Sequence, residues 1–214
     1  MKDELNKLLE PLFGATIESS YSTGGGSINQ TQVLKLTNGE RVFMKQNSNP
    51  PTDFFLAEIK GLKLLAQAKK GPKIPKPIAV QSSPRPTFLL MEYIENSSEG
   101  KNFADQFAQS LAELHRMTQE SYGLDHDNYI GNTPQKNALD KDGIHFFRDQ
   151  RINFQRKLAR QKGLLPASVD KKLDSLCDNL EKYLNISGEK PALIHGDLWS
   201  GNYFPDSQGK PCIF

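Results

Sequence analysis

The chain has 214 residues, of which 36% are hydrophobic and 24% are charged, a balance typical of a globular protein. No apolar run approaches the length of a membrane-spanning helix, and the first residues lack a signal-like pattern, so we expect a cytoplasmic protein without membrane contact. The formal net charge is only +2 and the basic residues are dispersed, which argues against a nucleic acid as partner.

Strand patterns dominate the segment after a short N-terminal helix, which leucines at helical spacing predict over residues 2–12. β-branched and aromatic residues predict one strand from Ile17 and a second over 28–36, with a Gly-rich turn between them. That turn contains Gly24, Gly25, Gly26 and Ser27. Its glycines would let the backbone approach phosphate oxygens and donate N–H groups to them, although a flexible hairpin is the simpler interpretation.

A lysine and a glutamate in consecutive elements predict an ion pair. A strand ends at Lys45, with Val42 and Met44 on one face and Lys45 on the other. A helix follows residues 50–53, and Glu58 lies within its apolar stripe. A carboxylate on a buried helix face is costly unless it is paired, so we expect Lys45 to be its partner. A solvated lysine on an edge strand is the alternative.

The middle of the chain changes from strand patterns to helical patterns. Residues 78–81 predict a fourth strand, and the apolar run 88–94 predicts a buried fifth strand that ends in the polar stretch 95–100. Helical spacing of apolar residues follows over 104–115, 146–160 and 168–184. We expect Ser168 to cap the last helix. The composition of 128–135 is that of a loop.

The stretch 193–202 reads Leu-Ile-His-Gly-Asp-Leu-Trp-Ser-Gly-Asn and contains the order His-x-Asp-x-x-x-x-Asn. Its apolar start is of strand type, so His195 would begin a loop whose side chains can reach a cleft. Phosphoryl transfer needs a carboxylate for the proton of the attacking hydroxyl and an amide oxygen that holds a metal, and Asp197 and Asn202 have these groups. An ordinary strand-to-turn junction with a capping aspartate is the alternative.

The motif His-Gly-Asp-Leu-Trp-Ser-Gly-Asn resembles the catalytic loop of the fructosamine kinase family, a branch of the aminoglycoside and choline kinase-like phosphotransferases that share the protein kinase fold. The resemblance extends to the order of the Gly-rich hairpin, strand lysine, helix glutamate, hinge strand and catalytic loop. It implies a two-lobed, protein-kinase-like α+β fold. The N-lobe would span 1–95 with a five-stranded antiparallel sheet, and a partial helical C-lobe would span 96–214.

The resemblance implies that ATP lies in a cleft. Lys45, paired with Glu58, would contact the α- and β-phosphates, and the Gly-rich turn would lie over the phosphates. Adenine would be held by main-chain groups at the end of the fifth strand, in Glu92, Tyr93 and Ile94. A plain core strand would show the same apolar pattern.

The resemblance also implies roles for the catalytic loop. Asp197 would be the base toward a substrate hydroxyl, and Asn202 would bind Mg²⁺. His195 would fix the loop on the substrate side. Trp199, the only tryptophan, would stack on an acceptor sugar, with a core tryptophan as the alternative.

Three functions remain open. The first is an ATP-dependent ketosamine kinase that phosphorylates a sugar hydroxyl of fructosamines or ribulosamines, on small glycated amines or glycated proteins, as a deglycation step. The second is the same chemistry on an aminoglycoside, choline or another small alcohol; a polycationic acceptor would favour an acidic lobe, which is not evident in the sequence. The third is a catalytically inactive kinase-like fragment that binds nucleotide.

The last residues predict a hairpin over 203–213 whose second strand ends on the apolar Phe214. In the family that the chain resembles, a magnesium-binding aspartate follows this strand. We therefore expect the 214-residue chain to be C-terminally truncated and impaired in activity, because metal neutralisation of the phosphates is central to transfer. Exposed apolar surface would then promote self-association.

Overall fold

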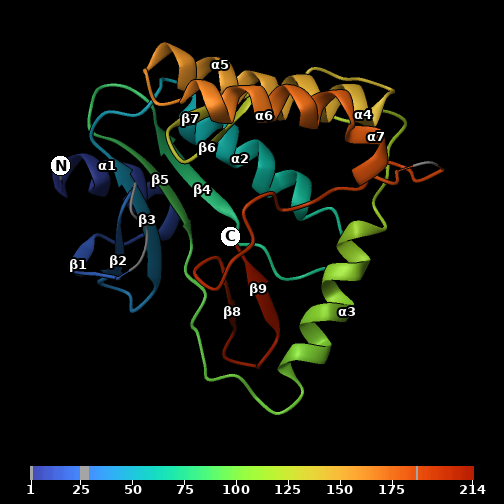
Figure 1. The fold of residues 1–214 in the computed structure, drawn as a ribbon. Coiled ribbons are helices and arrows are strands. Elements are labelled where there is room, and N and C mark those ends of the chain that lie inside the picture. Colours follow the sequence, from blue (N-terminus) through green and yellow to red (C-terminus); the bar gives the residue numbers. More distant parts are fainter. Residues whose placement is uncertain (1, 25–28, 187) are drawn as a thin grey trace. The chain divides into compact units, whose positions relative to one another are not determined.

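The computed structural model describes residues 2–24, 29–186 and 188–214. The chain divides into two compact units. Figure 1 shows the fold with colours that follow the sequence from the N-terminus to the C-terminus. The first unit consists of Met1–His115 and Ile194–Phe214, and the second consists of Arg116–Leu193. The lobes predicted over 1–95 and 96–214 stay a prediction, because compactness alone does not define a lobe.

A five-stranded antiparallel sheet is the centre of the first unit (Figure 1). Its strand order is β1-β2-β3-β5-β4, and each neighbouring pair is antiparallel. The strands are β1 (Ile17–Ser22), β2 (Gln30–Leu36), β3 (Arg41–Asn47), β4 (Pro77–Gln81) and β5 (Thr87–Glu92). The sheet predicted from the sequence is therefore confirmed.

Alternation along β3 separates its side chains into two environments. Val42 and Met44 belong to the apolar core and are 0% and 1% exposed. Phe43 and Lys45 are half-buried, as expected for the opposite strand face. Gly39 adopts a φ of +87°, which the tight connection from β2 to β3 requires. The predicted division of side chains between the two faces of β3 is thus confirmed.

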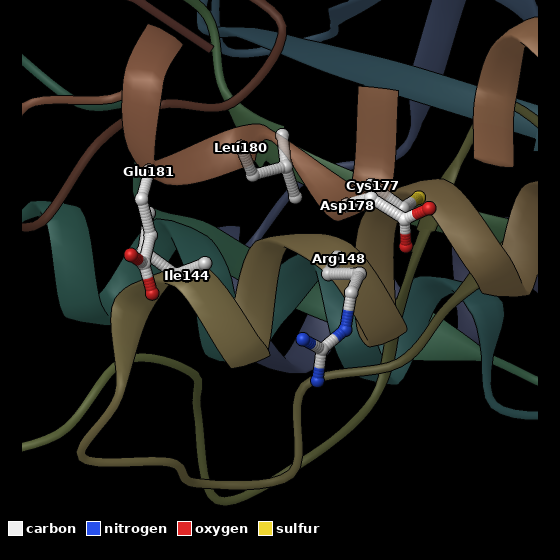
Figure 2. A pocket seen from close by; sticks show the side chains of 6 residues that line it. All are labelled: Ile144, Arg148, Cys177, Asp178, Leu180 and Glu181. Carbon is white, nitrogen blue, oxygen red and sulfur yellow. The ribbon is translucent and has the colours of Figure 1, made fainter. Parts of the chain in front are cut away.

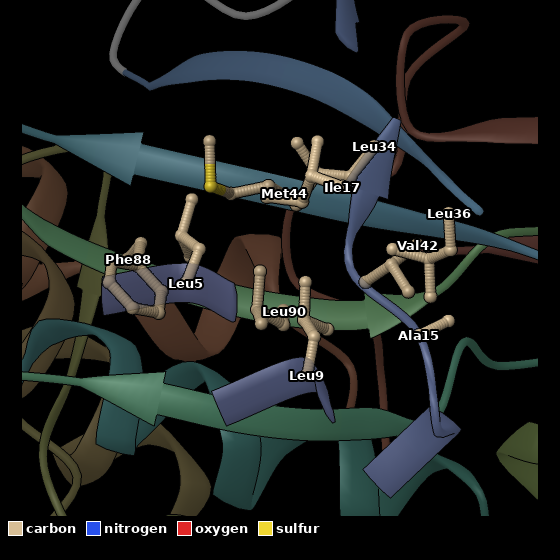
Figure 3. Packing of buried hydrophobic residues seen from close by; sticks show 10 residues of the cluster. All are labelled: Leu5, Leu9, Ala15, Ile17, Leu34, Leu36, Val42, Met44, Phe88 and Leu90. Atoms are coloured by element: carbon tan, nitrogen blue, oxygen red, sulfur yellow. The ribbon is translucent and has the colours of Figure 1, made fainter. Parts of the chain in front are cut away.

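The described residues of the first unit also form three helices. They are α1 (Lys2–Phe13), α2 (Phe54–Leu65) and α3 (Phe103–His115). Helix α1 confirms the predicted N-terminal helix, and its Leu5 and Leu9 join the core cluster formed with strand residues such as Leu90 (Figure 3). Leu9 is 0% exposed, whereas the adjacent Leu8 is 37% exposed. One face of α1 therefore covers the apolar side of the sheet.

The C-terminal hairpin is bonded to distant parts of the first unit. It consists of β8 (Tyr203–Pro205) and β9 (Pro211–Ile213). The backbone of Lys73 donates to the Pro211 oxygen at 2.8 Å and accepts from the Ile213 N–H at 3.0 Å. The Ser97 N–H donates to the Pro205 oxygen at 2.9 Å. These main-chain bonds place residues after 194 in the same compact unit as the sheet.

The second unit is mainly helical. Its elements are β6 (Asn128–Ile130), β7 (Thr133–Gln135), α4 (Gly143–Phe146), the π-helix η1 (Phe147–Asn153), α5 (Phe154–Gln161), α6 (Ala167–Asp178) and α7 (Leu180–Tyr183). Residues 128–135, predicted as a loop, form a small antiparallel hairpin instead. The helix predicted over 146–160 is divided among α4, η1 and α5, because the wider π-helical turn interrupts the α-helical bonding.

The helix predicted over 168–184 differs from the observed one at both ends. Helix α6 begins after Pro166, which is extended, and Ser168 lies inside the helix rather than at its cap. Asn179 ends α6 with a φ of −122°, and its Nδ2 donates to the Ser175 oxygen at 2.8 Å. Such a side-chain bond to a nearby carbonyl competes with continued helix.

Within residues 2–24, 29–186 and 188–214, none of the helices combines the length and the apolar character that crossing a lipid bilayer requires.

The buried face of α1 gives a stability prediction. Leu9→Ala should lower the free energy of unfolding by about 2–5 kcal/mol, because it opens a cavity between α1 and the sheet. Leu8→Ala, the matched control on the exposed side, should change it by less than about 0.5 kcal/mol. Urea unfolding followed by circular dichroism measures both values. Equal losses in the two variants would contradict the packing of α1 described above.

Candidate active site

The predicted ion pair between the strand lysine and the helix glutamate is present. The Lys45 Nζ on β3 lies 2.6 Å from the Glu58 Oε1 on α2. The two side chains are only 13% and 21% exposed, so little water screens them. Each charge removes the cost of burying the other, which explains a carboxylate on an otherwise apolar helix face. The lysine is thereby held on the half-buried face of β3.

His195 contacts two backbone groups, one in the predicted catalytic loop and one in Phe214. Its Nε2 lies 3.3 Å from the Phe214 carbonyl oxygen, and its Nδ1 accepts the Asp197 N–H at 3.3 Å. Burial lowers the pKa of His195, and the bond to the Phe214 oxygen opposes this only in part. Both contacts suit a neutral ring with its proton on Nε2. Gly196, with a φ of +88°, permits the sharp turn between His195 and Asp197.

Asp197 and Asn202 contact each other directly. The Asn202 Nδ2 donates to the Asp197 backbone oxygen at 2.7 Å and to its Oδ2 at 3.1 Å. This bond fixes which way the amide points, and within the described residues the Asn202 Oδ1 has no hydrogen-bond partner. The loop therefore presents an exposed carboxylate beside an amide oxygen.

These oxygens fit a magnesium ion better than a softer metal. Within the part of the chain that the structure describes, no group of three or more His, Cys, Asp or Glu residues could hold a metal by itself. Mg²⁺ usually takes one or two protein oxygens and completes its shell with water and substrate phosphates. Asp197 and Asn202 supply a donor set of that kind.

Trp199 lies on the surface of the loop. Its side chain is 56% exposed, so the alternative of a core tryptophan is wrong. A Cβ added to Gly201 would lie 2.4 Å from the Trp199 ring atoms Cζ2 and Cη2. The indole thus packs directly on the glycine, which leaves its other face open.

Phe214 is a contact residue that sequence reasoning missed. The Lys45 Nζ lies 5.2 Å from the centroid of its ring, within cation–π range. Its N–H donates to the Asn202 oxygen at 3.2 Å, and its own carbonyl faces His195. Phe214 therefore links the lysine on β3 to the predicted catalytic loop. Its apolar character was the only signal in the sequence, and it did not identify these partners.

Of the predicted adenine-binding residues, Glu92 is the last residue of β5, and Tyr93 and Ile94 follow it. The Glu92 N–H already donates to the Lys76 oxygen at 2.8 Å, and the Glu92 carboxylate lies 3.4 Å from the Lys73 Nζ. Within the described residues, the N–H of Ile94 has no hydrogen-bond partner. Of the three predicted positions, Ile94 therefore offers an uncommitted donor.

The Gly-rich turn is described only at its edge. Gly24 is exposed, and a Cβ built on it would meet nothing within 4 Å. The predicted phosphate-contacting residues Gly25, Gly26 and Ser27 lie outside the described residues. Their role stays a prediction.

The second unit contains a cavity of about 390 Å³ that none of the predicted site residues lines (Figure 2). It lies among α4, η1, α6 and α7, and its lining includes Arg148, Cys177 and Glu181. The guanidinium of Arg148 is paired with Asp149, with Nε 3.1 Å from Oδ1. All the residues that line this cavity belong to the second unit.

The environment of His195 predicts a pH dependence of stability. The folded chain lowers its pKa below the ordinary value of 6.5, so the unfolded chain binds this proton more readily. The contribution of neutral His195 to the free energy of unfolding should be fully present above pH 6.5 and should be lost as the pH falls below 6.5. In His195→Asn the free energy of unfolding should fall less steeply over this range. Urea titrations from pH 8 to pH 5 measure the difference, and parallel curves would refute it.

Comparisons with known proteins identify the family to which this chain is similar. A family model for fructosamine kinase matches residues 1–214. A probable ketoamine kinase from Enterococcus faecium is 35% identical over 87% of this chain and 65% of the relative. A chloroplastic protein-ribulosamine 3-kinase from Oryza sativa subsp. japonica is 36% identical over 90% of this chain and 56% of the relative. The chain thus spans between 56% and 65% of the length of these two relatives.

A solved structure supports the same assignment. The crystal structure of a candidate fructosamine-3-kinase from Haemophilus somnus 129PT matches with a TM-score of 0.84 and 27% identity, over 98% of this chain and 70% of that chain. Together with the antiparallel sheet, this similarity confirms the predicted kinase-like α+β fold class. Because the family model covers every residue from 1 to 214, the chain belongs to the fructosamine kinase family.

Proposed function

We propose that the protein is an ATP-dependent kinase that phosphorylates a sugar hydroxyl of ketosamines. The observation that carries the proposal is the meeting of Lys45 and the catalytic loop on Phe214, within one compact unit. A cation for phosphate groups and a carboxylate for an attacking hydroxyl are the two groups that phosphoryl transfer needs. Membership of the fructosamine kinase family supports the choice of acceptor.

In the proposed reaction, Lys45 binds the α- and β-phosphates of ATP, with its ammonium oriented by Glu58. Main-chain groups of Glu92, Tyr93 and Ile94 hold the adenine, and the turn from Gly24 to Ser27 covers the phosphates. These contacts position the γ-phosphate, and positioning supplies much of the rate in this chemistry.

On the acceptor side, Asp197 accepts the proton of the attacking sugar hydroxyl. Asn202 keeps the carboxylate oriented through its Nδ2, and its amide oxygen would hold Mg²⁺. That ion supplies neutralisation of phosphate charge when it is bound. His195 keeps the loop in shape, and the open face of Trp199 stacks on the sugar.

The proposed acceptors are small ketosamines, of the fructosamine or ribulosamine type, and glycated side chains of proteins. The proposed location is the cytoplasm, which supplies ATP. Phosphorylation of the sugar would be a step in the repair of glycated amines.

An acceptor panel tests the proposal. The 214-residue chain is incubated with radiolabelled ATP, Mg²⁺ and, separately, fructoselysine, ribuloselysine, glycated lysozyme, choline and kanamycin. Label transfer to a ketosamine supports the proposal, and Asp197→Asn, the matched control, should lower that rate by about 10²–10⁴ while it still binds ATP. Preferred transfer to choline or kanamycin would overturn the acceptor assignment. ATP binding without transfer to any acceptor would favour a nucleotide-binding module or the impaired activity expected of the 214-residue chain.

The ion pair gives a second prediction about nucleotide handling. Lys45→Met and Glu58→Gln should each weaken ATP binding, and the double variant should lose less than the sum, with a coupling of about 0.5–3 kcal/mol. Isothermal titration with ATP measures each dissociation constant. Lys190 and Glu120, a pair with both side chains exposed, provide the control cycle, whose coupling should be near zero. Strictly additive losses at Lys45 and Glu58 would mean that the two residues act independently.

A further inference from the structure

Three polar side chains surround the guanidinium of Arg41 and form a cluster with it. They are those of Tyr21, Tyr93 and Glu95. The Arg41 Cζ lies 4.4 Å from the centroid of the Tyr93 ring. Its Nη1 and Nη2 both lie 3.2 Å from the Glu95 Oε1. A residue of β3 is thus bound to two residues that follow β5, more than fifty positions later in the chain.

Tyr21 completes the cluster from β1. Its side chain shares a hydrogen bond with Tyr93, and burial followed by this bond raises the pKa of Tyr93. Tyr93 is therefore a neutral phenol at physiological pH, and its ring face is available to the cation. The side chain of Tyr93 is half-buried, whereas that of Glu95 is 54% exposed.

The segment 93–95 depends on these side-chain contacts because the sheet does not hold it. The ladder between β3 and β5 ends at the Val42–Glu92 pair, and the next backbone bridge is formed by Asn96 with Asp206. Residues 93–95 lie between these anchors without strand pairing. Arg41 contacts the first and the last of them, on either side of Ile94.

We propose that Arg41 is a positioning residue for nucleotide binding, which holds residues 93–95 so that the Ile94 N–H stays available to the edge of a nucleobase. The inference rests on the proposed function for the nature of the ligand. Arg41 itself does not touch the base or the phosphates in this proposal. Its effect should therefore appear in the affinity for the adenosine half of ATP and leave the phosphate half unchanged.

The test compares nucleotide affinities of Arg41→Gln with those of the unchanged chain. Displacement of a fluorescent ATP analogue gives dissociation constants for ATP, adenosine and tripolyphosphate. Arg41→Gln should weaken the binding of ATP and of adenosine by the same factor, about three- to tenfold. The reason is that residues 93–95, which Arg41 holds in place in the unchanged chain, would become ordered only when the ligand binds. The affinity for tripolyphosphate should not change. Turnover at saturating ATP should stay within about twofold, since the reacting groups are untouched.

Two further variants keep the test sharp. Arg41→Lys retains a charge for Glu95 but not a planar group for the Tyr93 ring, so its affinity for adenosine should be intermediate. Lys35→Gln breaks a comparable ion pair with Glu18 on the same sheet, with 48% and 51% exposure, and should leave every affinity unchanged. Thermal melts followed by circular dichroism establish whether each variant is folded. If Arg41→Gln does not fold, the affinities of Arg41→Lys are compared with those of the unchanged chain instead.

The outcomes separate this inference from the proposed function. Unchanged adenosine affinity in Arg41→Gln and Arg41→Lys overturns the inference, even if ketosamines are phosphorylated. Equal weakening of tripolyphosphate and adenosine also overturns it, because the effect would then be a general disturbance of the site. Weaker adenosine binding without phosphorylation of any acceptor supports the inference and contradicts the proposed function. No ATP binding by the unchanged chain overturns both.

Discussion

The ion pair between Lys45 and Glu58 is the interaction on which the candidate site depends. A pair that is only 13% and 21% exposed lies between two regimes. Exposed ion pairs contribute about 0–1 kcal/mol to the free energy of unfolding, whereas removing one partner of a buried pair lowers that free energy by about 3–5 kcal/mol. The pair therefore fixes β3 and α2 to each other, because neither side chain can rotate away without leaving the other charge unpaired and poorly solvated. Any phosphate bound by Lys45 would meet a cation whose position is already determined.

The attachment of the C-terminal hairpin to the sheet unit is the second constraint. The backbone of Lys73 forms two hydrogen bonds with β9, and Ser97 bonds to the end of β8. Asp206, which is 6% exposed, accepts the N–H groups of Gln208 and Lys210 and so closes the turn between the two strands. Main-chain bonds of this kind are insensitive to side-chain identity. They keep the predicted catalytic loop in the same compact unit as Lys45, although about 150 residues separate the two in the sequence.

Within the predicted catalytic loop, neighbouring residues orient the polar groups, and no regular secondary structure does so. His195 uses both ring nitrogens on backbone groups, and Asn202 spends its amide hydrogens on Asp197. The groups left over are the carboxylate of Asp197 and the amide oxygen of Asn202, both oxygen acceptors. A loop with this arrangement has little reorganisation to perform when a cation or a hydroxyl arrives.

The sequence by itself determined those features that local periodicity or burial cost can specify. The five strands, the N-terminal helix and the two faces of β3 follow from the spacing of apolar residues. The Lys45–Glu58 pair follows from the cost of a carboxylate on an apolar helix face. The His-x-Asp-x-x-x-x-Asn order nominated Asp197 and Asn202, and their direct contact agrees with that hypothesis.

Only the tertiary structure decided which distant residues meet. Phe214 and Arg41 gave no signal beyond their residue type, because each acts through partners that lie far along the chain. The exposure of Trp199 and its packing against Gly201 are likewise not specified by any spacing rule. The division of the helix predicted over 168–184 at Asn179 depends on one side-chain bond to a backbone carbonyl. Periodicity describes one element at a time, whereas these contacts arise when separate elements pack together.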